Sequence, residues 1–314
     1  MRQVSQLRKQ VTLLVVVLCA TGLLAQESSP SEQSKTANPE QKNVSLNPAE
    51  LVRRTVQKEI NAVNNAAPEH FMFRSHKEGP QGSQVKLYVE TKEGTAGMLV
   101  AINGQPLNEA QRQDEEQRVQ RFLNDPQELQ KKRKKEKEDA EHTLQIMRAL
   151  PDAFLYEPDG TVTGTAGVGA EGDELVRLKF RPNPRYSPPT HTEQVLTGME
   201  GHLLIDANRC RIAEIDGTLF RQVEFGWGIL GHLDKGGHFL VNQGEVGGSG
   251  WDVTRMTLNF SGKIMLFKSL HIQSTETYSD FRQVPKNLTF AEGVQVLKKE
   301  GPFIAENHAE AGGR

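Results

Sequence analysis

The second half of the chain, from Leu150 to Phe281, is a succession of short segments in which apolar and polar residues alternate, separated by glycine-rich turns. Alternation with a period of two is typical of strands with one buried face. No helical pattern lies between these segments, so they lack the crossover helices that a parallel sheet needs. An antiparallel sheet is therefore predicted. The expected strands are 176–180, 201–206, 211–215, 217–225, 239–243, 251–260 and 263–274, with turns at 206–208 and 261–262.

A helix and a smaller group of strands are expected before this region. The run Asn47-Pro48-Ala49-Glu50 supplies an N-cap, a proline suited to the first helical turn and a glutamate placed to close a capping box. The apolar face of this helix carries Val52, Val56, Ile60 and Val63. Strands 71–75, 85–91 and 97–102 follow, with a turn at Asn103-Gly104, which predicts an antiparallel meander.

Between these two groups lies a highly charged segment, 107–150, with a different character. From Glu109 to Glu141 it carries ten acidic and nine basic residues, and Pro126 divides it into two predicted helices. The basic run Lys131 to Lys137 could contact nucleic acid or anionic lipid. A solvated helix face with many ion pairs is the favoured interpretation.

The N-terminus has the three parts of a secretory signal. Basic residues in 1–10 precede an apolar run, 11–20, and a stretch of small residues that ends at Ala25. The apolar run is about half of the roughly twenty residues that a membrane span needs. We expect residues 1–25 to be a signal peptide cleaved near Ala25, which places the protein in the periplasm or outside the cell. Lipidation at Cys19 is disfavoured because Leu18 precedes it.

The remaining organisation follows from composition. Residues 26–46 are polar and predict a disordered linker, 47–297 a single α+β domain with the helical insertion 108–150, and 298–314 a flexible tail. A net charge of −2 provides no field to attract nucleic acid, so no nucleic acid partner is expected. Cleavage of the leader would leave Cys210 as the remaining cysteine, which we interpret as a packed small hydrophobe.

Two local patterns suggest ligand chemistry. The run 226–231 matches G-x-G-x-x-G, but a turn follows it where a dinucleotide site needs a helix, so no cofactor is expected. A zinc site that uses His232, Asp234 and His238 is an alternative, because side chains two apart on a strand share a face and a turn could return the third. Polar residues at a hairpin tip explain the same spacing. No nucleophile elbow or zinc-protease helix is present, and no catalytic residue is assigned.

The aromatic residues of the second strand group are the other candidate site. A bent, glycine-bearing sheet could either bury them in a filled core or leave an apolar hollow for a lipid or acyl chain. The predicted ligand-binding residues are Phe220, Phe225, Trp227, Trp251 and Phe260.

Three parts of the chain together resemble the LolA/LolB-like family of periplasmic lipoprotein carriers and related sensor domains. They are the amphipathic helix followed by a meander, the segment 201–206 that turns into 211–217, and the strand-like 251–260 paired with 263–270. The resemblance covers most of Asn47 to Phe281, and the charged segment 107–150 is an insertion for such a fold. It implies an incomplete antiparallel barrel with helices across its mouth and an apolar cavity for acyl chains.

The expected fold is thus α+β: a strongly curved antiparallel sheet or incomplete β-barrel packed on the N-terminal helix, with an inserted charged helical pair. The leading functional hypothesis is an exported, non-enzymatic protein of the bacterial cell envelope that binds a lipid, a lipoprotein acyl chain or a protein partner, with peripheral membrane contact left open. The alternatives are a metal-dependent hydrolase and an envelope scaffold whose helical pair docks a partner.

Overall fold

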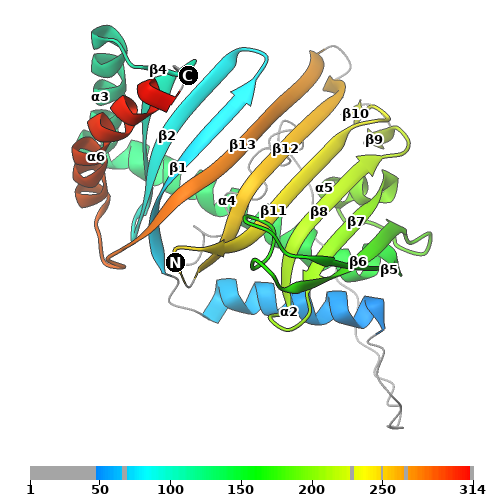
Figure 1. Ribbon diagram of the computed structural model, residues 1–314. Helices are drawn as coiled ribbons and strands as arrows, with labels where there is room; N and C mark the ends of the chain where they lie inside the picture. Colours follow the sequence, from blue (N-terminus) through cyan, green and yellow to red (C-terminus); the bar gives the residue numbers. More distant parts are fainter. Residues whose placement is uncertain (1–46, 66–68, 227–229, 249, 265–267, 312–314) are drawn as a thin grey trace.

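The structure is a computed structural model that describes residues 47–65, 69–226, 230–248, 250–264 and 268–311. Within these residues it is an α+β protein built on one open antiparallel sheet of thirteen strands (Figure 1). The main strand order is β4, β3, β2, β1, β13, β12, β11, β8, β7, β6, β5, and the short β10 pairs with β9 and β12. The predicted signal peptide and linker, 1–46, lie outside the described residues.

The strands are β1 His70–Gly79, β2 Gly82–Thr91, β3 Gly94–Ile102, β4 Gln105–Pro106, β5 Phe154–Thr163, β6 Glu174–Pro182, β7 Met199–Asp206, β8 Arg211–Leu219, β9 Val223–Phe225, β10 Gly231–Leu233, β11 His238–Val246, β12 Gly250–Ile264 and β13 Lys268–Val284. The helices are α2 Pro48–Asn65, α3 Glu109–Asn124, α4 Pro126–Ala153, α5 His191–Gln194 and α6 Phe290–Ala311, with a 3₁₀ turn, η1, at Val195–Gly198.

Some predicted boundaries are wrong. The expected turn at 261–262 lies inside β12, where Gly262 lets β10 approach: a Cβ at this position would lie 2.1 Å from the carbonyl oxygen of His232. The expected strand 217–225 is interrupted between Leu219 and Val223. Strand β5 was not expected, because Pro158 and Gly160 look like loop residues; they lie where its register with β6 shifts. Where a flexible tail was expected after 297, α6 continues to Ala311.

Two main cores occupy opposite faces of the sheet. On β1, Phe71 and Phe73 belong to one core while Met72, between them, belongs to the other, as alternation of side chains along a strand requires. We call the first the α4 face, because Ile146 and Leu150 of α4 pack into it. The second is the α6 face, where Val294 and Leu297 of α6 pack on β2 and β3.

Helix α2 joins the α4 face through a buried ion pair. Glu59 is buried and accepts hydrogen bonds from Arg211 Nε at 2.9 Å and from the backbone N–H of Ile212 at 3.0 Å, both on β8. Burial raises the pKa of the Glu59 carboxyl, although the Arg211 charge acts in the opposite direction. The helix is therefore tied to β8 by a carboxylate whose charge is costly to bury.

Helix α3 covers the edge of the sheet at β3. Glu115 accepts a hydrogen bond from the N–H of Leu99 at 2.7 Å, and Arg118 donates one to the carbonyl oxygen of Gly97 at 2.7 Å. The two side chains also pair with each other at 2.7 Å. They take the place of a neighbouring strand and satisfy an edge that would otherwise be open to pairing with another chain.

The charged segment forms the two helices that the sequence predicts. Asp125 caps α4 by accepting hydrogen bonds from the N–H groups of Gln127 and Glu128, and Pro126 is the first helical residue. Much of the basic run is paired within the helix. The pairs are Lys131–Glu128, Lys132–Glu136, Lys134–Glu138 and Lys137–Glu141. This arrangement agrees with a solvated, ion-paired face.

Candidate functional site

The four described members of the predicted aromatic site do not line one pocket. Phe225 and Phe260 are buried in the core of the α4 face. Trp251 packs against a separate small cluster formed by Leu175, Leu204 and Ala213. Phe220 is the most exposed of the four, at 36%, and Trp227 lies outside the described residues. The aromatic ligand site expected from the sequence is therefore not formed by these four residues.

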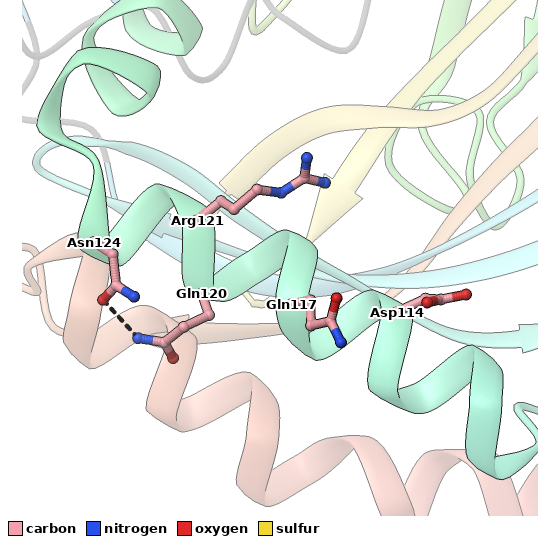
Figure 2. A pocket seen from close by; sticks show the side chains of 5 residues that line it. All are labelled: Asp114, Gln117, Gln120, Arg121 and Asn124. Atoms are coloured by element: carbon pink, nitrogen blue, oxygen red, sulfur yellow. Dashed lines mark hydrogen bonds between the residues drawn. The ribbon is translucent and has the colours of Figure 1, made fainter.

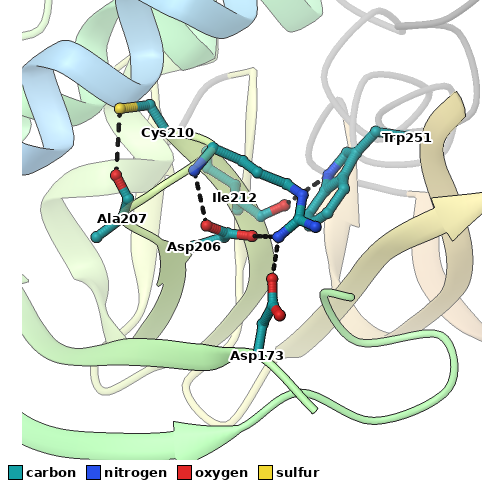
Figure 3. Close-up of polar contacts among 7 residues, drawn as sticks. Asp173, Asp206, Ala207, Cys210, Ile212 and Trp251 are labelled. Atoms are coloured by element: carbon teal, nitrogen blue, oxygen red, sulfur yellow. Dashed lines mark hydrogen bonds and ion pairs between the residues drawn. The ribbon is translucent and has the colours of Figure 1, made fainter. Parts of the chain in front are cut away.

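Figure 3 shows how Trp251 is held at the turn between β7 and β8. Its Nε1 donates to the carbonyl oxygen of Ile212 at 3.1 Å, and Arg209 bridges Asp206 and Asp173. Cys210, in the same turn, is half-buried and contacts the carbonyl oxygen of Ala207 at 3.5 Å. These contacts are local and structural: they fix the turn and the loop that carries Asp173.

The three residues of the alternative metal site are engaged separately. His232 Nε2 lies 3.3 Å from Asp234 Oδ1, whereas His238 Nε2 lies 2.8 Å from Asp216 Oδ1 on the neighbouring strand β8. Asp234 also accepts a hydrogen bond from Ser261 at 2.7 Å. In the part of the chain that the structure describes, no group of three or more His, Cys, Asp or Glu side chains is placed to hold a metal ion. The structure therefore does not bring these three side chains together as one ligand set, because His238 pairs with Asp216 of β8.

The glycine motif 226–231 connects the short strands β9 and β10. Gly226 follows the end of β9, and Gly231 begins β10 and pairs with Phe225 in antiparallel register. A dinucleotide site would need a helix to begin there, so that its N-terminal amides face the phosphates.

The best-defined candidate site is an apolar cavity of about 60 Å³ between α4 and the α4 face. Ile146, Met147 and Leu150 of α4 form one wall. The opposite wall comes from β5, β6, η1, β7, β8, β11 and β12. Its residues are Phe154, Tyr156, Phe180, Leu196, Met199, Leu203, Ile215, Phe239, Val241 and Leu258. The lining side chains are apolar, and their heteroatoms are the hydroxyl of Tyr156 and the thioether sulfurs of Met147 and Met199.

A few polar bonds hold α4 over this cavity. Tyr156 donates from its hydroxyl to the carbonyl oxygen of Leu150 at 2.8 Å, which satisfies one of the last four carbonyls of the helix. Gln145 donates to Glu193 and to Thr190, each at 2.8 Å, and so ties α4 to α5 and its N-cap. Burial raises the pKa of the Tyr156 hydroxyl, which keeps it protonated as a donor.

Glu193 is the centre of the second attachment. It is buried, and besides Gln145 it accepts a hydrogen bond from the hydroxyl of Tyr186. Burial raises the pKa of the Tyr186 hydroxyl, and the bond to Glu193 acts in the same direction. The attachment is thus a polar network at the rim of a hydrocarbon-lined space.

Two other hollows lie near α3. One, of about 560 Å³, is an open polar depression along a single helix, lined by Asp114, Gln117, Gln120, Arg121 and Asn124 (Figure 2). Gln120 and Asn124 bond each other at 2.9 Å, and the described walls provide no converging charge for a ligand. The other, of about 180 Å³, lies where α3 and α6 meet β3 and is lined partly by Met98, Leu99 and Leu107.

Comparisons with known proteins identify no relative: no family model, no curated protein and no solved structure matches this chain. Among the described residues, no helix is both long enough and apolar enough to cross a membrane.

Proposed function

We propose that this protein is an exported, non-enzymatic component of the bacterial cell envelope that binds the acyl chain of a lipid or lipoprotein between α4 and the α4 face. One observation carries the proposal: the cavity is lined by hydrocarbon from seven sheet or turn elements and from the amphipathic end of α4. Such a surface favours an apolar ligand because burial of its hydrocarbon releases it from water.

The size of the cavity sets a condition on binding. Pockets that bury small ligands have volumes of roughly 300 Å³ or more, whereas this cavity measures about 60 Å³. An acyl chain therefore enters when the C-terminal half of α4 moves away from the sheet. This movement breaks the polar contacts of Tyr156 and Gln145. It also breaks those of Asp152, whose carboxylate pairs with Arg53 at 3.1 Å and whose carbonyl oxygen accepts a hydrogen bond from Asn183 at 2.9 Å.

The proposed function also involves the curvature of the sheet. We propose that the sheet curls as an incomplete barrel over the N-terminal helix, in the manner of the LolA/LolB-like carriers that the sequence resembles. Export is supported by the three-part signal pattern of residues 1–25. A carrier of this kind works in a compartment outside the cytoplasm, where it exchanges an acyl chain with a membrane or a second protein.

The direct test fills the cavity. Leu203 is buried in its sheet wall, so Leu203→Phe places a larger side chain where the ligand would lie. We expect a fluorescent fatty acid to bind the wild-type protein and its affinity to fall at least about tenfold in the variant, a change of ~1.4 kcal/mol. Leu297→Phe, the same change in the core of the α6 face, is the matched control and should leave binding intact.

A second variant tests the movement of α4. Tyr156→Phe removes the bond to Leu150, worth about 1 kcal/mol, and should raise the population of the open state about fivefold. Stopped-flow measurements should then show faster uptake of the fatty acid. Lack of binding by the wild-type protein, or equal binding by wild type and Leu203→Phe, would overturn the proposed function.

A further inference from the structure

A half-buried lysine lies on the same sheet face as the cavity, on strand β2. Lys86 pairs across the strands with Ser75 of β1, and Ser75 in turn pairs with Tyr278 of β13. Side chains directly opposite one another in antiparallel strands share a face. Tyr278 belongs to the core of the α4 face, so Lys86 projects from that face as well.

The surroundings of Lys86 are aromatic and hydroxylic. Phe73 and Tyr88, on the same face, stack with ring centroids 5.2 Å apart. Ser75 is buried and donates its hydroxyl proton to Glu276, which also accepts a hydrogen bond from Tyr278. Two hydroxyl donors thus stabilise the Glu276 carboxylate without the lysine.

Lys86 has no carboxylate within ion-pair distance among the described residues. The charged groups around it are Arg118, Glu115, Glu276 and Lys77, and Arg118 and Glu115 already pair with each other at 2.7 Å. Including Lys86, the group holds three positive and two negative charges. Burial lowers the pKa of the Lys86 ammonium, and the Arg118 charge acts in the same direction. An anion bound here would offset both the cost of burying the ammonium and its repulsion by Arg118.

The apolar cavity and Lys86 are within reach of one amphiphilic molecule. Leu258 of β12 lines the cavity and pairs with Ser274 of β13, whereas Lys86 lies in register with Tyr278, four residues further along β13. Three strand spacings across the sheet and this offset along the strands, about 14 Å each, place the two residues roughly 20 Å apart. Met256, Tyr278 and Phe73, all buried on this face, lie along the way. An extended acyl chain of about sixteen carbons spans this distance, along apolar side chains that are buried and must separate to admit it.

We propose that Lys86 binds the anionic head group, a carboxylate or a phosphate, of an amphiphile whose acyl chain occupies the cavity under α4; this inference rests on the function proposed above. The ligand class is therefore an acidic single-chain lipid. Lys86 is a binding residue that selects for the charge of the head group, while the cavity accepts any chain of suitable length.

The experiment measures displacement of a neutral apolar dye from the purified protein by hexadecanoate, hexadecyl phosphate, hexadecanol and acetate. In the wild-type protein we expect the two acidic amphiphiles to compete better than hexadecanol and acetate not to compete. Lys86→Gln should weaken the acidic amphiphiles about tenfold, as expected for the loss of a charged hydrogen bond, and leave hexadecanol unchanged. Lys86→Arg should retain the preference.

Lys299→Gln, an exposed lysine of α6, is the control for a change in net charge and should behave as the wild type. Equal weakening of hexadecanol and hexadecanoate by Lys86→Gln would show a structural role and overturn the inference, as would competition by acetate or the absence of any preference in the wild type. Failure of the dye and of every amphiphile to bind the wild-type protein would instead overturn the proposed function itself.

Discussion

The two ends of the sheet are covered by helices on opposite faces and in different ways. On the α6 face, Phe290, Val294 and Leu297 of α6 form a stripe that packs on β2 and β3. Gly293 lets this helix come close: a Cβ there would lie 2.6 Å from Thr91 Cγ2. On the α4 face, α4 spans an apolar cavity and is fixed at its rim by hydrogen bonds.

This difference separates a packed helix from one that can move. Close-packed side chains resist any displacement, because a small gap already forfeits much of the dispersion energy. Helix α4 also buries apolar residues, Ile146, Met147 and Leu150 among them, but the cavity beside them removes part of these contacts. Each hydrogen bond at its rim contributes about 1 kcal/mol. The α4 face thus keeps unfilled space beneath its helix, whereas the α6 face is closely packed around Gly293.

The largest expected effect comes from matched substitutions in the two cores. Phe260 and Phe290 are both buried, in the α4 face and the α6 face respectively. Phe260→Ala should cost about 3 to 5 kcal/mol of global unfolding free energy, because it leaves a void in the larger core. Phe290→Ala should cost less, since the loss cannot exceed the free energy of undocking α6.

Urea unfolding followed by circular dichroism gives both values, and limited proteolysis reports the release of α6. Equal losses of global unfolding free energy in the two variants, without enhanced cleavage near α6, would contradict the difference between the two faces. That result would mean that the two cores unfold as one unit of uniform stability.

A smaller effect concerns the ion pair that joins α2 to the α4 face. Arg211→Met leaves the Glu59 carboxyl buried without its cation and should cost about 3 kcal/mol at neutral pH. The pKa of Glu59 is raised from its ordinary value of 4.5, and this variant raises it further. Because the folded pKa is raised, the buried carboxyl is tolerated best below pH 4.5, where it is protonated. This stabilising contribution is lost as the pH rises through the folded pKa and the carboxyl becomes charged.

The deficit of Arg211→Met relative to the wild type should therefore be largest near pH 8 and shrink toward pH 4.5. Thermal melts across this range measure it. The control is Arg53→Met, at an exposed arginine of α2, the helix that carries Glu59. Its thermal stability should differ little from the wild type at any pH. A deficit independent of pH would indicate that Arg211 acts through packing alone.

The smallest effect tests the close approach of α6. Alanine at a helical glycine gains about 0.5 to 1 kcal/mol in helix propensity, but Gly293→Ala also introduces the clash with Thr91, which costs about 1 to 3 kcal/mol. We expect a net loss of about 1 kcal/mol. Thr91→Ser removes Cγ2, keeps the hydroxyl that bonds Gly94 at 2.6 Å, and should restore the stability of the double variant.

A thermodynamic cycle of the four proteins measures this coupling. If Gly293→Ala is neutral or stabilising by itself, α6 is less closely packed than the structure indicates. The contrast between the two faces would then become weaker.

Several elements could be predicted from local sequence. The antiparallel class follows from alternation without intervening helices, and the division of the charged segment follows from Pro126, which cannot continue a helix but can begin one. The ion-paired character of the basic run follows from spacings of three and four residues. All of these features depend on residues that are neighbours in the chain.

The candidate site could not be predicted in the same way. The sequence pointed to aromatic residues between 220 and 260, whereas the cavity gathers its walls from α4 and from strands across the sheet. Glu115 and Arg118 looked like ordinary members of a charged helix and in fact cover the edge of β3. Lys86 is one polar residue of the expected strand 85–91, and nothing local in the sequence distinguishes it.

The sequence by itself determined the spacing of apolar and polar residues, and with it where most strands and helices form. Only the tertiary structure decided which face each helix covers. The physical reason is visible in β1, where Phe71, Met72 and Phe73 are all buried, so that local pattern cannot distinguish the two faces. Burial depends on partners distant in sequence, and those partners place the cavity under α4 and Lys86 on the same face.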